Sequence, residues 1–494
     1  MRNTINHSNF RSINPKLYHP VHWLLVILII QSCQFSDSLN EQPPNIIYIL
    51  ADDFGIGDLG IYGQKIIKTP HLDQLAQSGL RFLNHYSGST VCAPARSVLM
   101  TGQHAGKTPI RGNKEVWPEG QMSLPDESFT VAEILQENGY ITGAFGKWGL
   151  GFVGTEGDPT HQGFDTFFGY NCQREAHRYY PEHLWDNQDR YPIKDNRINQ
   201  TVYAPDLIHA RALDFIKQHQ DKPFFLYYPS VIPHAELMIP ENSFFETYRG
   251  KFEETPWINS AIGANYGDGD FNVAHYATQI QPKATMAAMI SYLDNQVGQI
   301  IELVDQLGLS KNTIIMFTSD NGPHQEGGAD PDFFDSNGIN RGYKRDLYEG
   351  GIKVPFLVSW QGVIPKNTVS NHISSFADFL PTITDLLDID NPENIDGISF
   401  LPTLEGNTQI KHEYLYWEFH ELGGRQAVRY GKWKGIKLNV KNPDITQFEL
   451  YDLENDPQET VNISQHELEV TSRINQIMDS EHISSDLFSL LQKD

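Results

Sequence analysis

The chain has 494 residues, with 37 Lys and Arg against 62 Asp and Glu, so its formal charge is −25. Such an acidic chain is not expected to bind nucleic acid or an anionic membrane surface, because both are polyanions. Hydrophobic residues make up 39% of the chain, which is enough for a large packed core. The three cysteines, Cys33, Cys92 and Cys172, are too few for a disulfide framework or a zinc cluster.

Residues 1–33 have the pattern of a lipoprotein-type export signal. Basic residues precede a short apolar run at 23–30 that is too short to span a membrane, and the run ends in Ile-Gln-Ser-Cys. This ending resembles a bacterial lipobox, in which Cys33 would be lipidated. We therefore expect a linker at 34–43 and an exported protein, periplasmic or in the outer membrane of a Gram-negative bacterium, with any membrane contact through a lipid anchor. A plain signal peptide or an N-terminal tail is the alternative.

Short apolar runs alternate with helical patterns between residues 44 and 400. The strand-like runs lie at 45–50, 140–144, 223–228, 313–318 and 355–360, and the helical patterns at 72–80, 130–138, 204–218 and 283–307. This alternation predicts an α/β domain at 44–400, with a doubly wound, mostly parallel sheet and helices on both faces.

The pattern changes after residue 400. Short aromatic-rich runs follow at 414–419, 426–429, 433–438 and 448–451. Such runs are typical of a small antiparallel sheet. We therefore expect residues 401–494 to form a smaller α+β subdomain with an antiparallel sheet and a closing helix.

Polar side chains follow two of the predicted strands directly. Asp52 and Asp53 come after the first strand, and Asp320 and Asn321 come after the strand at 313–318. In open α/β sheets the carboxyl ends of the strands form the edge where ligands bind. Taken singly, each aspartate could equally be a helix cap or a turn residue.

The segment around Cys92 predicts a short helix with a cysteine at its start. Pro94 suits the first turn of a helix and Gly102 suits its end. Cys92 would then lie where free N–H groups and the helix dipole favour an anion, and Arg96, one turn later, would add a fixed cation. On its own, such a cysteine could equally be a buried core thiol.

The run Cys92-Ala93-Pro94-Ala95-Arg96, followed by Thr101-Gly102, resembles the signature of the type I sulfatases of the alkaline phosphatase superfamily. The resemblance extends over roughly residues 45–465, in the order of that family. It implies an alkaline-phosphatase-like fold and oxidation of Cys92 to formylglycine by a formylglycine-generating or sulfatase-maturating enzyme. It also implies hydrolysis of a sulfate ester through the hydrate of this aldehyde, with a sulfo-enzyme intermediate.

The resemblance further implies a calcium ion. Its ligands would be Asp52, Asp53, Asp320, Asn321 and the modified Cys92, which match the family's positions. Carboxylate and amide oxygens are the ligands that Ca²⁺ prefers in proteins.

Three more catalytic residues are implied by short matches to the family. Lys147 lies in Gly-Lys-Trp, His234 in Pro-His, and Lys344 stands ahead of Glu-Gly-Gly. With Arg96, the two lysines would neutralise the sulfate group, and His234 as an imidazolium would protonate the departing oxygen. Without the resemblance, a lone lysine is usually a surface residue and a lone histidine a core residue.

The sequence departs from the family at one position. Many relatives have Gly-Lys-Trp-His, whereas this chain has Gly149 in place of that histidine. The sequence does not show which residue replaces it, although His104 and Lys107 are candidates.

Two polar segments are expected to contact the substrate. Residues 171–181 combine polar and aromatic groups that can hydrogen-bond and stack on a sugar ring. They resemble a loop of sulfatases from polysaccharide-degrading bacteria, as does the segment at 417–421. We expect a sulfated oligo- or polysaccharide as substrate and Arg174, His177 and His420 as sugar contacts. An ordinary polar loop is the alternative.

Three other functions compete with this interpretation. A phosphomonoester or phosphonate hydrolase of the same superfamily would use the same residues. A metal-independent cysteine hydrolase would need a histidine partner for Cys92, and it does not explain Asp52, Asp53 and Asp320. A carbohydrate-binding surface lipoprotein without activity would be expected to lack some of the motif residues, yet all are present.

Overall fold

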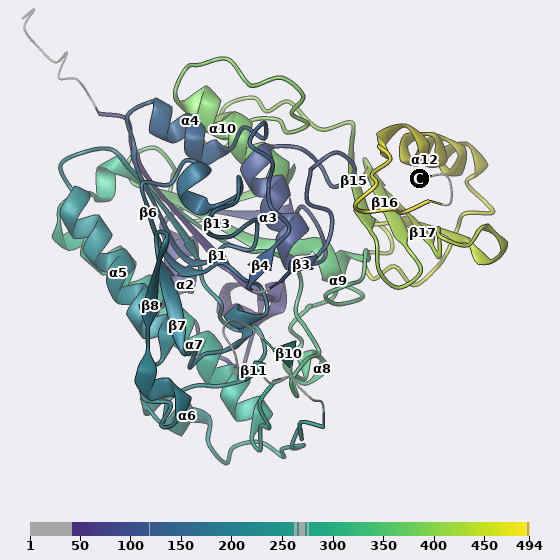
Figure 1. Ribbon diagram of the computed structural model, residues 1–494. Coiled ribbons are helices and arrows are strands. Elements are labelled where there is room, and N and C mark those ends of the chain that lie inside the picture. Colours follow the sequence, from purple (N-terminus) through teal and green to yellow (C-terminus); the bar gives the residue numbers. More distant parts are fainter. Residues whose placement is uncertain (1–41, 118, 261–263, 266–271, 274–275, 492–493) are drawn as a thin grey trace, which may run out of the picture. The chain divides into compact units, whose positions relative to one another are not determined.

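The first strand, β1 (Asn45–Ala51), lies inside a ten-stranded sheet in the computed structural model (Figure 1). The structure describes residues 42–117, 119–260, 264–265, 272–273, 276–491 and 494, so the predictions for Cys33 and the signal peptide lie outside it. The strands in order are β14 (Thr368–Ser375), β2 (Leu80–Tyr86), β13 (Lys353–Trp360), β12 (Thr313–Ser319), β1, β9 (Phe224–Pro229), β5 (Ile141–Lys147), β6 (Thr166–Tyr170), β7 (His183–Asp186) and β8 (Asp189–Pro192).

The side chains of β1 are buried on both faces of the sheet. Ile47 and Ile49 pack into one hydrophobic core, and Ile46, Tyr48 and Leu50 pack into the other. A strand covered on both faces is apolar along its whole length, which is why this run could be identified in the sequence. β1 pairs in parallel with β12 on one side and with β9 on the other.

Helices cover both faces (Figure 1). The core of one face contains residues of α2 (Pro70–Ser78), α5 (Ala204–His219) and α7 (Pro282–Gln306), with α6 (Ser243–Tyr248) against α7. The core of the other face contains residues of α3 (Cys92–Thr101), α4 (Val131–Glu137), α10 (Phe379–Leu386) and α11 (Leu401–Leu404). The predicted doubly wound α/β sheet is therefore confirmed.

The edges of the sheet differ from the prediction. The strands β2, β6, β7, β8 and β14 were not predicted, and α2 ends at Ser78, two residues before β2 begins. β13 was predicted as a strand, but it runs antiparallel to both β12 and β2. Short elements complete the body: β3 (Glu115–Val116), β4 (Gly120–Gln121), β10 (Ala264–Asn265), β11 (Asn272–Val273), α8 (Pro331–Phe334) and α9 (Glu349–Ile352).

The C-terminal region forms the predicted antiparallel sheet. Its strands follow one another as β15 (Tyr414–Phe419), β16 (Arg425–Tyr430), β17 (Trp433–Leu438) and β18 (Gln447–Asp452). The closing helix α12 (Leu468–Glu481) packs on one face, and Trp417 on the other face packs with Tyr86 and Val91 of the body. No helix in the described part of the chain is long and apolar enough to cross a membrane.

Candidate active site

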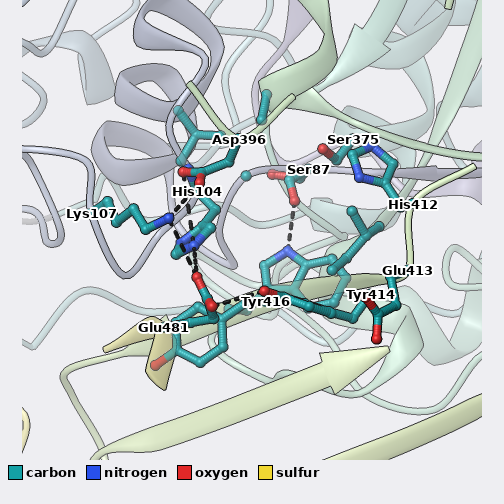
Figure 2. Close-up of a pocket in the computed structure, with 15 residues that line it drawn as sticks. Ser87, His104, Lys107, Ser375, Asp396, His412, Glu413, Tyr414, Tyr416 and Glu481 are labelled. Atoms are coloured by element: carbon teal, nitrogen blue, oxygen red, sulfur yellow. Dashed lines mark hydrogen bonds and ion pairs between the residues drawn. The ribbon is translucent and has the colours of Figure 1, made fainter. Parts of the chain in front are cut away.

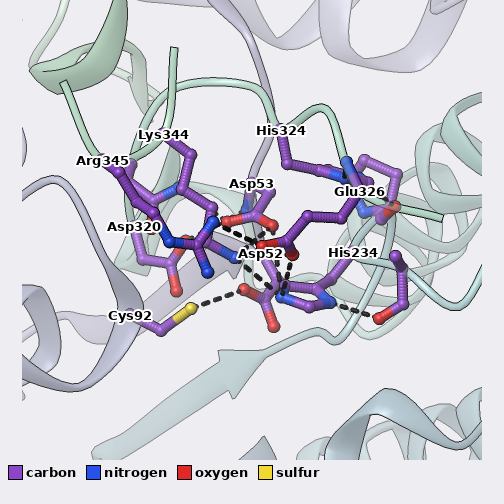
Figure 3. A network of polar contacts seen from close by, with 12 residues as sticks. Asp52, Asp53, Cys92, His234, Asp320, His324, Glu326, Lys344 and Arg345 are labelled. Carbon is purple, nitrogen blue, oxygen red and sulfur yellow. Dashed lines mark hydrogen bonds and ion pairs between the residues drawn. The ribbon is translucent and has the colours of Figure 1, made fainter. Parts of the chain in front are cut away.

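Acidic and basic side chains from several strands meet at the carboxyl edge of the large sheet (Figure 3). Asp52 and Asp53 follow β1, Asp320 and Asn321 follow β12, and Lys147 is the last residue of β5. All five side chains are buried. The structure thus brings together polar residues that are far apart in the sequence.

Backbone contacts tie the ends of β1 and β12 together. Asp53 has a left-handed backbone conformation, with φ of 64°, which an aspartate tolerates better than most residues. Its N–H donates to Oδ1 of Asp320 at 3.1 Å, and the next N–H, of Phe54, donates to Oγ of Ser319 at 2.8 Å. These contacts fix the position of the paired carboxylates relative to Asp320.

Cys92 is the first residue of α3, as predicted, and lies next to these carboxylates. Its Sγ is 3.2 Å from Oδ1 of Asp52 (Figure 3). Arg96, one turn along α3, donates to Oδ2 of Asp320 at 2.8 Å and also to the carbonyl of Lys147. The helix therefore presents both the candidate nucleophile and a cation to the same cluster.

The thiol of Cys92 is not activated in this environment. Burial, together with the negative charges of Asp320 and Asp52, raises the pKa of Cys92 well above its usual value. A cysteine hydrolase needs the thiolate, which a neighbouring histidine or other cation must stabilise. The surroundings of Cys92 therefore argue against an unmodified cysteine as the nucleophile.

Two buried lysines neutralise the paired aspartates. Nζ of Lys147 is 2.7 Å from Oδ2 of Asp52, and Nζ of Lys344 is 2.7 Å from Oδ2 of Asp53. Burial alone would raise the pKa of Asp52, but the positive charges around it, first that of Lys147, hold that pKa below its usual range. Both lysines therefore belong to the buried cluster and not to the surface.

The protonation of His234 differs from the expectation. Its Nε2 accepts a hydrogen bond from Nζ of Lys344 at 2.8 Å, and its Nδ1 donates to the carbonyl of Ala235. Burial and then the charge of Lys344 lower the pKa of His234 well below its usual value. In this arrangement the imidazole is neutral, and Lys344 carries the proton that we expected on His234.

The acidic residues fit a hard divalent cation. Asn321 donates from Nδ2 to Oδ1 of Asp53 at 2.6 Å, while its buried Oδ1 has no hydrogen-bond partner among the described residues. Burial and the charge of Asp52 raise the pKa of Asp320 to about 6, even though Arg96 pairs with this carboxylate. Carboxylates beside an unused amide oxygen form the all-oxygen ligand set that Ca²⁺ prefers.

Other residues at this site were not found by sequence reasoning. Glu326 lies 3.5 Å from Nζ of Lys344, accepts a hydrogen bond from Tyr276 at 2.9 Å and pairs with Arg345. His324 stacks on His234 with 5.6 Å between ring centroids. Both His324 and Glu326 lie in the loop after Asn321, so proximity to the motif was the only available signal.

The three predicted sugar contacts lie in different surroundings. His177 stacks on His234 with 4.3 Å between ring centroids, so the structure brings it to the cluster. Arg174 pairs with Glu115 at 2.8 Å. His420 lies 3.3 Å from Glu418, and its Nδ1 is 3.0 Å from the carbonyl of Arg111.

Gln173 occupies the space beside Gly149. Gly149 has φ of 80°, and a Cβ at this position would lie 2.0 Å from Nε2 of Gln173. The candidates His104 and Lys107 do not fill this gap. They line a separate cavity of about 260 Å³, where they pair with Asp396 and Glu481 (Figure 2).

Comparisons with known proteins show the family of the chain. The family model described as Sulfatase matches residues 44–389, and one for the C-terminal part of N-sulphoglucosamine sulphohydrolase matches residues 341–483. The chain belongs to the sulfatase family. A sulfatase is a sulfuric ester hydrolase, and its fold is that of the alkaline phosphatase superfamily.

Known sulfatases and a solved structure resemble this chain over most of their length. The N-acetylgalactosamine-6-sulfatase of Canis lupus familiaris is 31% identical over 446 residues, covering 83% of this chain and 75% of the relative. The N-acetylgalactosamine-6-O-sulfatase of Bacteroides thetaiotaomicron is 28% identical and covers 91% of this chain and 95% of the relative. The solved structure of Ps i-CgsB with k-i-k-neocarrahexaose has a TM-score of 0.73 at 26% identity, covering 92% of this chain and 96% of that chain.

Proposed function

We propose that this sulfatase removes sulfate from a sulfated oligo- or polysaccharide, using formylglycine made from Cys92 and a calcium ion. The main observation in support is that Cys92, three buried carboxylates and two buried lysines meet at one edge of the sheet. The carbohydrate substrate is supported by the names of the relatives, which include sulfatases of N-acetylgalactosamine.

Formylglycine at position 92 would supply the nucleophile that the protonated thiol cannot. The hydrate of the aldehyde carries two hydroxyl groups on one carbon. One can attack sulfur, and loss of the proton from the other allows sulfate to leave as the aldehyde forms again. A serine at this position has one hydroxyl and lacks this route for release.

The calcium ligands would be Asp52, Asp53, Asp320 and Asn321. When bound, the ion would offset the carboxylates and polarise the sulfate oxygens. Arg96 already holds one oxygen of Asp320, and Lys147 and Lys344 lie beside Asp52 and Asp53. These cations would stabilise the negative charge of a sulfate ester bound beside them.

The proton for the departing sugar oxygen would come from the Lys344–His234 pair. Nζ of Lys344 donates to Nε2 of His234, so a proton is held between the two side chains beside Asp53. General acid catalysis needs a donor within hydrogen-bond reach of the leaving group. We assign this role to the pair and not to a free imidazolium. His177, Arg174 and His420 remain the proposed sugar contacts.

Export and lipidation at Cys33 also remain proposals. They are supported by the basic and apolar pattern of residues 1–33. The maturating enzyme would be a required partner for the modification of Cys92.

The test is to express the chain with and without a sulfatase-maturating enzyme. The mass of the peptide that contains residue 92 reports the modification. Sulfate and phosphate esters of the same sugar are then compared as substrates. We expect the modified protein to release sulfate over many turnovers and to prefer the sulfate ester.

Two cysteine variants make this test specific. Cys92→Ser should lose repeated turnover, by about 10³-fold or more. Cys172→Ala should keep activity within about threefold, because Cys172 does not belong to the cluster of Asp52, Asp53, Cys92 and His234. Sustained turnover by Cys92→Ser, or a preference for the phosphate ester, would overturn the proposal.

A further inference from the structure

Two glutamates and a histidine meet in a second buried cluster, made of residues outside the proposed catalytic set. Nε2 of His183 is 2.7 Å from Oε1 of Glu119, and Nδ1 of His183 is 3.3 Å from Oε1 of Glu175. Their exposed fractions are 8% for Glu119, 1% for Glu175 and 2% for His183. One ligand atom from each residue lies within 4.8 Å of the other two.

The carboxylate of Glu175 lacks a hydrogen-bond donor. Neither of its oxygens accepts a hydrogen bond from a donor group of the described residues, and the side chain next to it, Glu119, is a second carboxylate. Its nearest nitrogen, Nδ1 of His183, lies 3.2 Å from Nη2 of Arg190, whose guanidinium can only donate. With Nε2 donating to Glu119, Nδ1 is an acceptor, so Glu175 faces a lone pair and not an N–H.

Protonating His183 does not give every polar group of the cluster a suitable hydrogen-bond partner. An imidazolium would donate to both carboxylates, but its Nδ1–H would then point at a guanidinium donor. Arg190 lies 4.0 Å from Glu119, and its charge also acts on Glu175, but no hydrogen bond joins it to Glu175 among the described residues. A buried carboxylate without a donor is costly, by several kcal/mol in protein interiors. A small cation beside Glu175 would offset this cost.

We propose that Glu119, Glu175 and His183 form a structural binding site for a divalent transition metal, of which Zn²⁺ is the best match. An imidazole nitrogen with carboxylate oxygens is a ligand set that Zn²⁺ accepts, whereas Ca²⁺ prefers oxygen ligands alone. Arg190, whose side chain is 38% exposed, can turn toward solvent when Nδ1 binds the ion.

The metal would join three separate segments of the chain. Glu119 lies between β3 and β4, Glu175 begins the short 3-10 turn at Glu175–His177, and His183 begins β7. The same turn carries His177, whose ring stacks on His234. The ion would therefore hold the loop that places His177 beside the active site, without contacting the reacting groups.

The experiment measures metal content and thermal stability, so neither readout requires catalysis. The full chain is stripped with a chelator, incubated with Zn²⁺, desalted and analysed by elemental mass spectrometry. We expect one zinc per chain, and a rise in Tm of about 3 °C when Zn²⁺ is added to the stripped protein. Glu175→Gln and Glu119→Gln, which keep the side-chain shape, should lose both the zinc and the rise in Tm.

Two control variants separate this site from the active site and from nearby charge effects. Glu115→Gln removes an exposed carboxylate in the same hairpin and should keep the zinc. Asp53→Asn should also keep it, because Asp53 belongs to the other cluster. Circular dichroism checks that each variant is folded.

Two results would overturn the proposal. One is a wild-type chain that retains no zinc after desalting. The other is zinc that is lost in Asp53→Asn and kept in Glu175→Gln, which would place it in the active site. In either case the two glutamates would instead share a proton, an arrangement that burial and the nearby charge of Glu119 favour by raising the pKa of Glu175.

Discussion

Asn321 illustrates how one side chain can serve both the fold and a metal. Its Nδ2 donates to Asp53, which holds the ends of β1 and β12 together, and its buried Oδ1 is left without a partner in the described part of the chain. A buried carbonyl oxygen without a donor costs free energy that a cation can offset.

At this scale we predict that Asn321→Ala weakens calcium binding by about 10- to 100-fold. The measurement is a calorimetric titration of the chelator-treated protein with Ca²⁺. Asn312→Ala is the control, because Asn312 lies at the opposite end of β12 and its amide faces the carbonyl of Pro43. Equal affinity in Asn321→Ala and the wild type would remove Asn321 from the ligand set.

The sequence motifs picked out charged residues that the structure brings together, but they did not indicate the protonation of His234. The motifs around Asp52, Cys92 and Lys344 were recognisable, and the structure brings these residues together. The neutral state of His234 depends on Lys344, which is 110 residues away in the sequence. No local sequence pattern predicts that contact. Likewise, Gln173 beside Gly149 is visible only in three dimensions.

At the scale of elements, β15 is connected to the proposed metal ligand Asp320 by hydrogen bonds. Nε1 of Trp417 donates to the carbonyl of Ser87 at 2.9 Å, and the hydroxyl of Ser87 donates to the backbone carbonyl of Asp320. Trp417 is also buried in the core shared by the small sheet and the body. The C-terminal sheet therefore reaches a proposed metal ligand through only one intervening residue.

We predict that Trp417→Ala lowers the free energy of unfolding by about 3–5 kcal/mol, because it removes a large buried side chain. Trp417→Phe should cost less stability but still lower kcat by about tenfold, since Ser87 loses its donor and Asp320 shifts. Urea unfolding and steady-state kinetics measure the two effects. Trp433→Phe, in the core on the opposite face of the same sheet, is the control and should leave kcat unchanged.

A buried ion pair joins the segment before β15 to the turn before α10. Nε2 of His412 is 2.8 Å from Oδ1 of Asp378. Burial alone would lower the pKa of His412, but the charge of Asp378 outweighs it and raises that pKa. Because the folded pKa lies above the unfolded value, the pair stabilises the fold fully below about pH 6.5 and progressively less as pH rises through the folded pKa.

We therefore predict that His412→Gln lowers the free energy of unfolding by about 1.5 kcal/mol at pH 5.5, and by less at pH 9. Urea unfolding of the two proteins at several pH values gives the difference. A difference that grows with pH would mean that the pair does not act through the charge of His412.

Burial explains only part of which strands could be predicted, because β6 was missed although four of its five residues are buried. β1 and β12 are buried along their whole length, so their apolar runs were clear in the sequence. β8 is largely open to solvent and β14 is only partly buried, and both mix polar with apolar residues, so they resembled loops. The antiparallel direction of β13 could not be predicted, because a strand's residues do not encode its direction relative to its neighbours.

At the scale of the whole molecule, a formal charge of −25 repels a sulfated polymer. The site itself nevertheless contains the cationic side chains of Arg96, Lys147 and Lys344. Long-range repulsion of this kind slows association and is screened by salt. We predict that kcat/KM for a sulfated polysaccharide rises about threefold between about 10 mM and about 150 mM salt. A monosaccharide sulfate, with one charge, should change less; a fall in kcat/KM for the polymer would contradict this account.

The position of β1 has a consequence for the order of events during synthesis. β1 is made early, but its neighbour β12 follows much later: Asn45 pairs with Thr313, 268 residues further along the chain. Until that strand emerges from the ribosome, the pocket around Cys92 cannot close. The time needed to synthesise those residues is therefore a window in which a modifying enzyme can reach a cysteine that the finished fold leaves only 1% exposed.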